Sequence, residues 1–267
     1  MTISLRPRGP FSLGEPLTLA LTDDGGDAVA FRATWDGEAV EVDFVSDLPG
    51  AKVEAHVARV LSLDVDATGL AEVGERDPVI GRLLEEAAGR RPVCFGTPFE
   101  AAVWAVLSQR VSMAQAGRVK EALAASLGTR MEIGGAEVVA FPGPAALAEV
   151  DELPGVWASK LGRIRGLAGA AAAGDLDPAL LRSLDLDAAI THLESLPGIG
   201  PFGAMLVLAR GAGHPDVPPP TLRRFRQAVA SAYALPEEPD EAKLASLSEA
   251  WRPYRAWITY LLRSSGR

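Results

Sequence analysis

The chain has 267 residues, of which 48% are hydrophobic and 23% are charged, and its formal net charge is −9. This composition is too apolar for a disordered protein, and the length suits one large domain or two small ones. The single cysteine, Cys94, excludes a disulfide framework, a cysteine-ligated zinc site and an iron–sulfur cluster. No stretch of about 18 apolar residues occurs, and the N-terminus lacks the apolar core of a secretory signal. We therefore expect a cytoplasmic protein with no membrane contact.

Charge is distributed unevenly along the chain. Residues 1–75 carry 5 basic and 14 acidic side chains, whereas residues 201–267 carry 9 basic and 6 acidic ones. Net acidity argues against a nucleic-acid partner, but attraction to phosphate is local because salt screens it beyond about 8–10 Å. Because the last quarter of the chain is mildly basic, nucleic acid is still a candidate partner. The alternative is that these basic side chains belong to an ordinary solvated surface.

The first 75 residues predict a small α+β unit with an antiparallel sheet. Residues 31–35 and 39–44 alternate apolar and polar side chains, and Asp36-Gly37-Glu38 between them predicts a tight turn. Residues 17–21 predict a further strand. Residues 51–63 have the apolar spacing of a helix. We expect this unit to form an N-terminal accessory domain over residues 1–75.

From about residue 76 the apolar period changes to 3.6, and we expect an all-α domain over residues 76–267. The links between apolar segments hold Gly and Pro, which end and begin helices. Helices are predicted at residues 77–88, 98–109, 112–127, 144–150, 157–173, 178–183, 187–195, 201–210, 222–233, 240–248 and 251–263.

One link between two of these helices has a sequence that indicates a binding function. Its sequence is Leu196-Pro197-Gly198-Ile199-Gly200. Glycines allow positive φ and the close approach of another backbone. Amides of the link and of the following first helical turn lack partners within the helix, and they can point at a phosphate. The segment therefore predicts contact with a nucleic-acid backbone. Such a contact positions the protein on the nucleic acid but does not read its base sequence. A plain αα-hairpin is the alternative.

This hairpin, together with other segments, resembles the helix–hairpin–helix DNA glycosylase superfamily. Within it, the chain is most similar to bacterial 3-methyladenine DNA glycosylase II. The further segments are residues 99–112, 153–168, the Gly213-His214-Pro215-Asp216 loop and Trp251-Arg252-Pro253-Tyr254-Arg255-Ala256-Trp257. The resemblance covers residues 76–263, and the strand-rich front fits the family's accessory domain.

The resemblance implies a DNA repair glycosylase acting in base excision repair. Such a protein binds damaged double-stranded DNA, flips one base out and hydrolyses the N-glycosidic bond of an alkylated purine such as 3-methyladenine. It implies a monomer with no required cofactor, and a monovalent cation held by hairpin carbonyls around Leu196 and Ile199. Lyase members of the superfamily carry a lysine where this chain has Phe202, so no lyase activity is expected.

The resemblance also implies site residues. DNA contacts are expected from the hairpin and from three further positions, and Gln109 and Leu127 are expected to enter the minor groove and fill the gap left by the flipped base. A basic face is expected around the last-quarter arginines. The DNA-binding set is Gly198, Ile199, Gly200, Gln109, Leu127 and Arg223, and the base pocket is lined by Phe202 and Trp104. Core packing is the alternative for Leu127 and Phe202.

The chain departs from the family at the catalytic position. Leu222 stands where the family has an aspartate that stabilises the positive sugar of the transition state. Asp216 matches an earlier, non-catalytic aspartate, for which a turn-stabilising role is expected. Two hypotheses stay open: an active glycosylase that relies on a positively charged leaving base, and a degenerate DNA-binding homologue. A helical interaction protein with a purely structural hairpin is a remote third.

Overall fold

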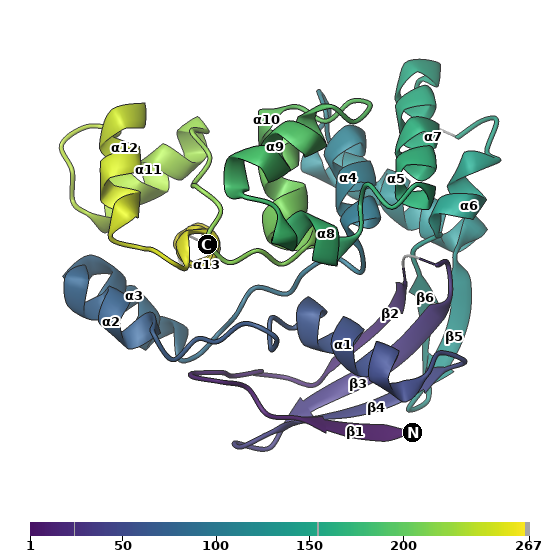
Figure 1. Ribbon diagram of the computed structural model, residues 1–267, viewed down its shortest axis with the longest axis horizontal. Helices are drawn as coiled ribbons and strands as arrows, with labels where there is room; N and C mark the ends of the chain where they lie inside the picture. The colour runs from purple at the N-terminus through teal and green to yellow at the C-terminus, as the bar shows by residue number, and fades with distance from the viewer. Residues whose placement is uncertain (24, 154, 265–267) are drawn as a thin grey trace.

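The computed structural model describes residues 1–23, 25–153 and 155–264. A four-stranded antiparallel sheet lies at the base of Figure 1, and helices stack above it. The predicted fold class, a small N-terminal sheet followed by a helical core, is confirmed. None of the helices described is long and apolar enough to cross a membrane.

The sheet forms from the alternating segments of the first 46 residues. Its strands pair in the order β1-β4-β3-β2. The strands are β1 (Thr2–Leu5), β2 (Leu17–Thr22), β3 (Ala28–Trp35) and β4 (Val40–Ser46). The period-two pattern puts Phe31 and Val42 on one face, where they are fully buried against Val53 and Val57 of helix α1 (Gly50–Val60). Strand β1 was not predicted, because four residues are too short to show alternation.

The helices match the predicted ranges to within a few residues, apart from the unpredicted α2. Side chains of Asp77, Thr97, Ser112, Asp177 and Asp240 cap five of them by accepting first-turn amides. The helices after α1 are α2 (Leu70–Arg76), α3 (Pro78–Ala87), α4 (Pro98–Leu107), α5 (Met113–Leu127), α6 (Pro144–Ala148), α7 (Ala158–Ala172), α8 (Pro178–Ser183), α9 (Leu186–Glu194), α10 (Pro201–Leu206), η1 (Val207–Gly211), α11 (Arg223–Ala232), α12 (Glu241–Glu249) and α13 (Arg255–Ser264). The π-helical turn η1 continues α10 directly.

A β-hairpin that was not predicted interrupts the helical part. Strands β5 (Thr129–Ile133) and β6 (Ala136–Ala140) pair around Gly134 and Gly135, whose φ angles are +56° and +78°. The hairpin packs against β2 and β3 of the N-terminal sheet (Figure 1). A Gly-Gly pair between two short alternating segments is a hairpin signal that the sequence does contain.

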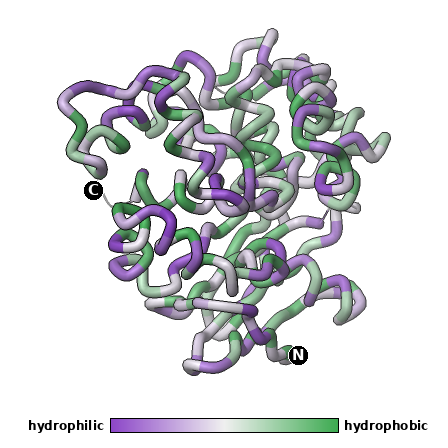
Figure 2. The backbone as a smooth tube through the Cα atoms, turned by 60° about the vertical axis from the view of Figure 1, so that its left-hand side comes forward, coloured by the Kyte–Doolittle hydropathy of each residue, from purple (hydrophilic) through white to green (hydrophobic). Residues whose placement is uncertain are grey.

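Buried side chains of the described residues form three clusters. One lies between the N-terminal sheet and α1, one joins α4 and α7 with α9, α10 and η1, and one joins α2 and α3 with α11 and α13. Hydrophobic and hydrophilic stretches alternate along the chain in Figure 2, as amphipathic elements require. Ala67, Leu70 and Val73 belong to the third cluster, with Val229 and Ile258. The packing therefore does not follow the predicted division between residues 75 and 76.

Helix α1 is tied to the helical core by two side chains. His56 Nε2 lies 2.6 Å from the carbonyl oxygen of Gly96, and Arg59 Nη1 donates to the carbonyl of Phe95 at 3.2 Å. Arg59 also donates to the carbonyl of Gly211, at the end of η1. Burial, together with the nearby charge of Arg59, lowers the pKa of His56 to about 4. The imidazole is therefore neutral when it bonds to this carbonyl at neutral pH.

Candidate functional site

The link between α9 and α10 has the geometry that a phosphate contact requires. Gly198 adopts φ +79°, and the Ile199 amide donates to the Leu196 carbonyl at 3.1 Å. Within the part of the chain that the structure describes, the amides of Gly198 and Gly200 have no hydrogen-bond partner. A Cβ placed on Gly200 would meet nothing within 4 Å. The hairpin thus offers free N–H groups beside open space.

The side chain of Gln109, which lies just after α4, forms a hydrogen bond with this hairpin. Its Nε2 donates to the Gly198 carbonyl at 2.7 Å, and its Oε1 accepts from Arg163 Nη1 at 3.0 Å. The predicted contact of Gln109 with DNA stays a prediction, because the structure shows this side chain engaged with the hairpin. Its observed contacts are those of a residue that positions the Gly198 carbonyl.

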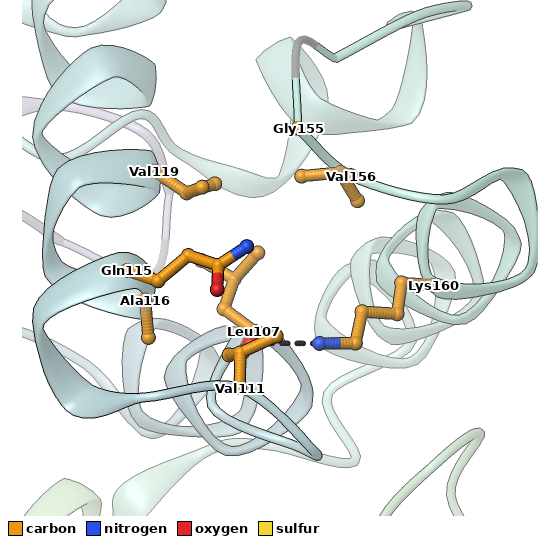
Figure 3. A pocket seen from close by; sticks show the side chains of 8 residues that line it. All are labelled: Leu107, Val111, Gln115, Ala116, Val119, Gly155, Val156 and Lys160. Atoms are coloured by element: carbon orange, nitrogen blue, oxygen red, sulfur yellow. Dashed lines mark hydrogen bonds between the residues drawn. The ribbon is translucent and has the colours of Figure 1, made fainter.

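Lys160 completes the connection between helices α4 and α7. Its Nζ donates to the carbonyls of Leu107 at 2.8 Å and Gln109 at 2.7 Å, where α4 has just ended. Figure 3 shows the first of these bonds at the wall of a small cavity between α5 and the segment before α7. The cavity has about 10 Å³, which is room for one water at most. This place is therefore a structural junction and not a substrate pocket.

Helix α7 lies directly against the hairpin. A Cβ on Gly198 would come within 2.6 Å of Arg163 Cδ, and a Cβ on Gly166 within 2.7 Å of Pro197 Cγ. Only glycine satisfies both the left-handed φ and the space at position 198. The close approach explains why these two small residues occur where α7 and the link meet.

The two predicted base-pocket residues lie on neighbouring helices. Phe202 is in the first turn of α10 and is 38% exposed, and Trp104 is half-buried on α4. Helices α4 and α10 touch beside them, since a Cβ on Gly203 would lie 3.5 Å from Ala105 Cβ. Phe202 is therefore not a fully buried core residue. Its role in holding a base stays a prediction.

Leu127 does not lie with the hairpin. It is the last residue of the 15-residue helix α5, so about 21 Å of helix separates it from Met113 at the other end. Strand β5 follows at Thr129, which places Leu127 beside the sheet. The side chain of Leu127 is 37% exposed, and its role in filling the gap left by a flipped base stays a prediction.

Leu222 directly precedes helix α11, at its N-cap position. Its side chain is 46% exposed and makes no cap, while its carbonyl accepts from the amide of Phe225 at 2.9 Å. The position expected to carry an acid is thus an apolar side chain in contact with solvent.

Asp216 forms a buried ion pair instead of facing a substrate. Its Oδ1 accepts from Arg255 Nε at 2.8 Å, and its Oδ2 accepts from Arg252 Nη1 at 2.9 Å. The Arg255 side chain is only 4% exposed. The Asp216 amide donates to His214 Nδ1 at 3.1 Å. These contacts agree with the structural role expected for Asp216 and fix the start of α13 to the loop before α11.

The arginines expected to form the basic face are mostly neutralised. Arg223 and Arg226 share Glu238, at 3.3 Å and 3.6 Å, and Arg252 pairs with both Asp216 and Glu249. The predicted DNA contact of Arg223 stays a prediction, although a carboxylate already holds its Nε.

Positive charge without carboxylates lies instead on the α7 side of the hairpin. Among the described residues, Arg110, Lys160 and Arg163 form no ion pair. They are separated by 53 residues in the sequence, so counting charge along the chain could not reveal that they gather in space.

The fold is shared with solved DNA glycosylases. A 3-methyladenine DNA glycosylase from Archaeoglobus fulgidus superposes with a TM-score of 0.80 at 21% identity, over 98% of this chain and 97% of that chain. An 8-oxoguanine glycosylase/lyase from Clostridium acetobutylicum, solved with DNA, superposes with a TM-score of 0.66 at 15% identity, over 93% and 87%. These likenesses define the architecture.

In sequence, the chain is similar to a protein named as a DNA repair enzyme and to one named as a DNA-3-methyladenine glycosylase, which confirms the resemblance to the 3-methyladenine branch. It is 33% identical over 207 residues to a Mycobacterium tuberculosis protein called probable bifunctional transcriptional activator/DNA repair enzyme AlkA, covering 77% of this chain. It is 24% identical over 219 residues to a Bacillus subtilis DNA-3-methyladenine glycosylase, covering 79% of this chain and 71% of that protein. The chain spans about two fifths of the length of the mycobacterial relative. No family model matches it.

Proposed function

We propose that the protein is a DNA repair glycosylase that binds damaged duplex DNA, flips a base and excises alkylated purines of the 3-methyladenine type. The hairpin between α9 and α10, with its free amides at Gly198 and Gly200, is the observation that carries this proposal. The names of the similar repair proteins support the same substrate class.

Binding would start from the DNA backbone. The hairpin amides, aided by the dipole of the helix that follows, would hold one phosphate, and the unpaired cations Arg110 and Arg163 would add attraction. Flipping a base costs a few kcal/mol and costs least where the base is damaged or poorly paired. A contact that does not depend on sequence is suited to searching for such sites.

Excision would break the bond between the sugar C1′ and the purine nitrogen. A purine alkylated at N3 or N7 is cationic, so it takes the bonding electron pair and leaves as a neutral base. Water then adds its oxygen to C1′ and gives its extra proton to solvent. With Leu222 at the start of α11, no carboxylate assists at that position, and the charge of the leaving base supplies the driving force.

The activity would be that of a monofunctional glycosylase, without strand cleavage. Phe202 occupies the position of the superfamily's lyase lysine and offers no amine for a Schiff base. Treated DNA would hold abasic sites that break only after heating in alkali.

The hairpin carbonyls would fit a monovalent cation. Carbonyl oxygens are ligands of hard cations, and the Ile199 carbonyl has no hydrogen-bond partner in the described chain. The Leu196 carbonyl keeps one lone pair after accepting from Ile199. When bound, the ion would add positive charge behind the amides that face the phosphate.

A catalytically degenerate DNA-binding homologue is the second candidate. The exposed apolar side chain of Leu222 and the engagement of Asp216 with Arg252 and Arg255 favour it. Such a protein would bind duplex DNA with salt-dependent affinity and would release no base.

One assay separates the two candidates. The protein is incubated with duplex DNA treated with a methylating agent, and the free bases are identified by chromatography. Release of 3-methyladenine or 7-methylguanine above the spontaneous rate supports the glycosylase. DNA binding without release supports the homologue, and no binding contradicts both.

A further inference from the structure

The indole of Trp157 is held at the surface with nothing covering it. Trp157 directly precedes α7, and its side chain is 70% exposed. Its backbone is fixed, because its carbonyl accepts from the amides of Lys160 at 2.9 Å and Leu161 at 3.1 Å. Among the described residues no ring contact or hydrogen bond involves the indole. Tryptophan is among the residue types enriched at the centres of binding interfaces.

The position of Trp157 is set by the same junction that holds the hairpin. Lys160, one turn further along α7, bonds to the carbonyls of Leu107 and Gln109. Arg110, which directly follows Gln109, is exposed and adopts a left-handed φ of +57°. Arg163 bonds to Gln109 and touches the hairpin. Arg110 thus follows Gln109, Arg163 bonds to Gln109, and Trp157 lies one turn before Lys160 at the start of the same helix. We call Trp157, Arg110 and Arg163 the Trp157 face.

The charge of this face favours an anionic partner. Neither arginine has a carboxylate partner in the described chain. Desolvation and the nearby charge of Arg163 both lower the pKa of Lys160, as expected where cations gather. Two acids, Asp151 and Glu152, precede Trp157 in the sequence, and Asp151 is held by Arg165 at 2.7 Å.

We propose that the Trp157 face is a second DNA contact, in which the Trp157 ring stacks on a base that has lost its stacking neighbour while Arg110 and Arg163 bind the flanking phosphates. The combination of an aromatic ring and unpaired cations is the chemistry that recognises unstacked nucleotides. This inference rests on the proposed function, because a flipped or missing base leaves such an unstacked neighbour beside it.

Binding of labelled duplexes by fluorescence anisotropy tests this inference. One duplex is fully paired, and the other carries a tetrahydrofuran abasic analogue. Trp157→Ala should weaken binding to the abasic duplex about tenfold and binding to the paired duplex less than twofold. Trp157→Phe should keep most of the affinity, because a ring remains. Thermal unfolding of each variant checks that the fold is intact.

Salt dependence tests the arginines. Arg110→Gln should reduce the slope of log affinity against log salt by about one, because one phosphate contact is lost. Arg82→Gln is the matched control, since Arg82 is an exposed cation without an ion pair on α3, away from the hairpin. Equal slopes for Arg110→Gln and the wild type would overturn the proposed contact of Arg110 with a phosphate.

The outcomes separate this inference from the proposed activity. If Trp157→Ala weakens abasic-duplex binding but the wild type releases no base, the Trp157 face stands and the glycosylase fails. If the wild type binds the abasic duplex and Trp157→Ala binds it equally well, the inference fails and the glycosylase is unaffected. If the wild type binds neither duplex, both fail.

Discussion

At the residue scale, the two positions at which the family motif has an acid differ in this chain: position 216 keeps an aspartate, and position 222 is a leucine. Leu222 could be assigned to the helix start from the sequence, and the structure places it at the N-cap of α11. The partners of Asp216 could not be predicted, because Arg252 and Arg255 lie 36 and 39 residues away along the chain. A motif gives positions along the chain, whereas an ion pair depends on how distant segments pack.

Replacing Leu222 with an acid should raise catalysis. Leu222→Asp would place a carboxylate where the sugar develops positive charge, and such electrostatic groups are worth roughly 10²–10³ in rate. We expect base release from methylated duplex to rise about a hundredfold in single-turnover assays. Leu222→Asn is the control of equal size, and equal rates for the two variants would contradict this assignment.

Breaking the buried ion pair should destabilise the fold. Asp216→Asn removes the closer of the two carboxylates that pair with buried Arg255, and breaking such a pair typically costs about 3–5 kcal/mol. Glu249→Gln is the control, because Glu249 binds the same arginines but is 61% exposed and should cost less than about 1 kcal/mol. Urea unfolding measures both, and similar losses would show that burial of the pair is unimportant.

At the element scale, the helices could be predicted because long apolar periods survive in the sequence. The ranges of α7 and α8 came within one or two residues of the observed ones. The β5–β6 hairpin was missed because its strands are short, although Gly134-Gly135 marks its turn. The link between α9 and α10 was predicted as a turn, but its contact with α7 through Gly166 and Arg163 could not be.

The two glycines of the link should respond differently to alanine. Gly198→Ala would combine a left-handed φ with a clash against Arg163, so we expect a stability loss of more than about 1 kcal/mol and weaker duplex binding. Gly200→Ala meets no atom within 4 Å, so the fold should keep its stability. Its methyl group would still hinder a phosphate, and the variant should bind duplex more weakly. Unchanged binding by Gly200→Ala would contradict the backbone contact.

At the scale of the whole molecule, packing joins segments that the sequence assigns to separate units. Residues 67–73 pack with the C-terminal helices, and β5–β6 packs on the N-terminal sheet. The acidic total charge likewise hid the unpaired cations of the Trp157 face. Such features depend on three-dimensional neighbours, which composition and periodicity do not contain.

The junction between α1 and the helical core should make stability depend on pH. His56 stays neutral in the folded protein down to about pH 4, whereas the unfolded chain takes up a proton below about pH 6.5. Stability should therefore fall as pH decreases from about 6.5 to 4, by about 3 kcal/mol from this group. His56→Gln keeps a donor for Gly96 and should remove that part of the slope. Identical slopes in wild type and variant would contradict a neutral, half-buried imidazole.

The most direct measurement of the central claim is the release of free base from methylated duplex by the wild-type protein, with Gly200→Ala run in parallel. The account predicts that the wild type liberates 3-methyladenine without nicking the strand, and that Gly200→Ala needs more enzyme for the same release. Wild-type protein that binds the duplex yet leaves every methylated base attached would contradict it.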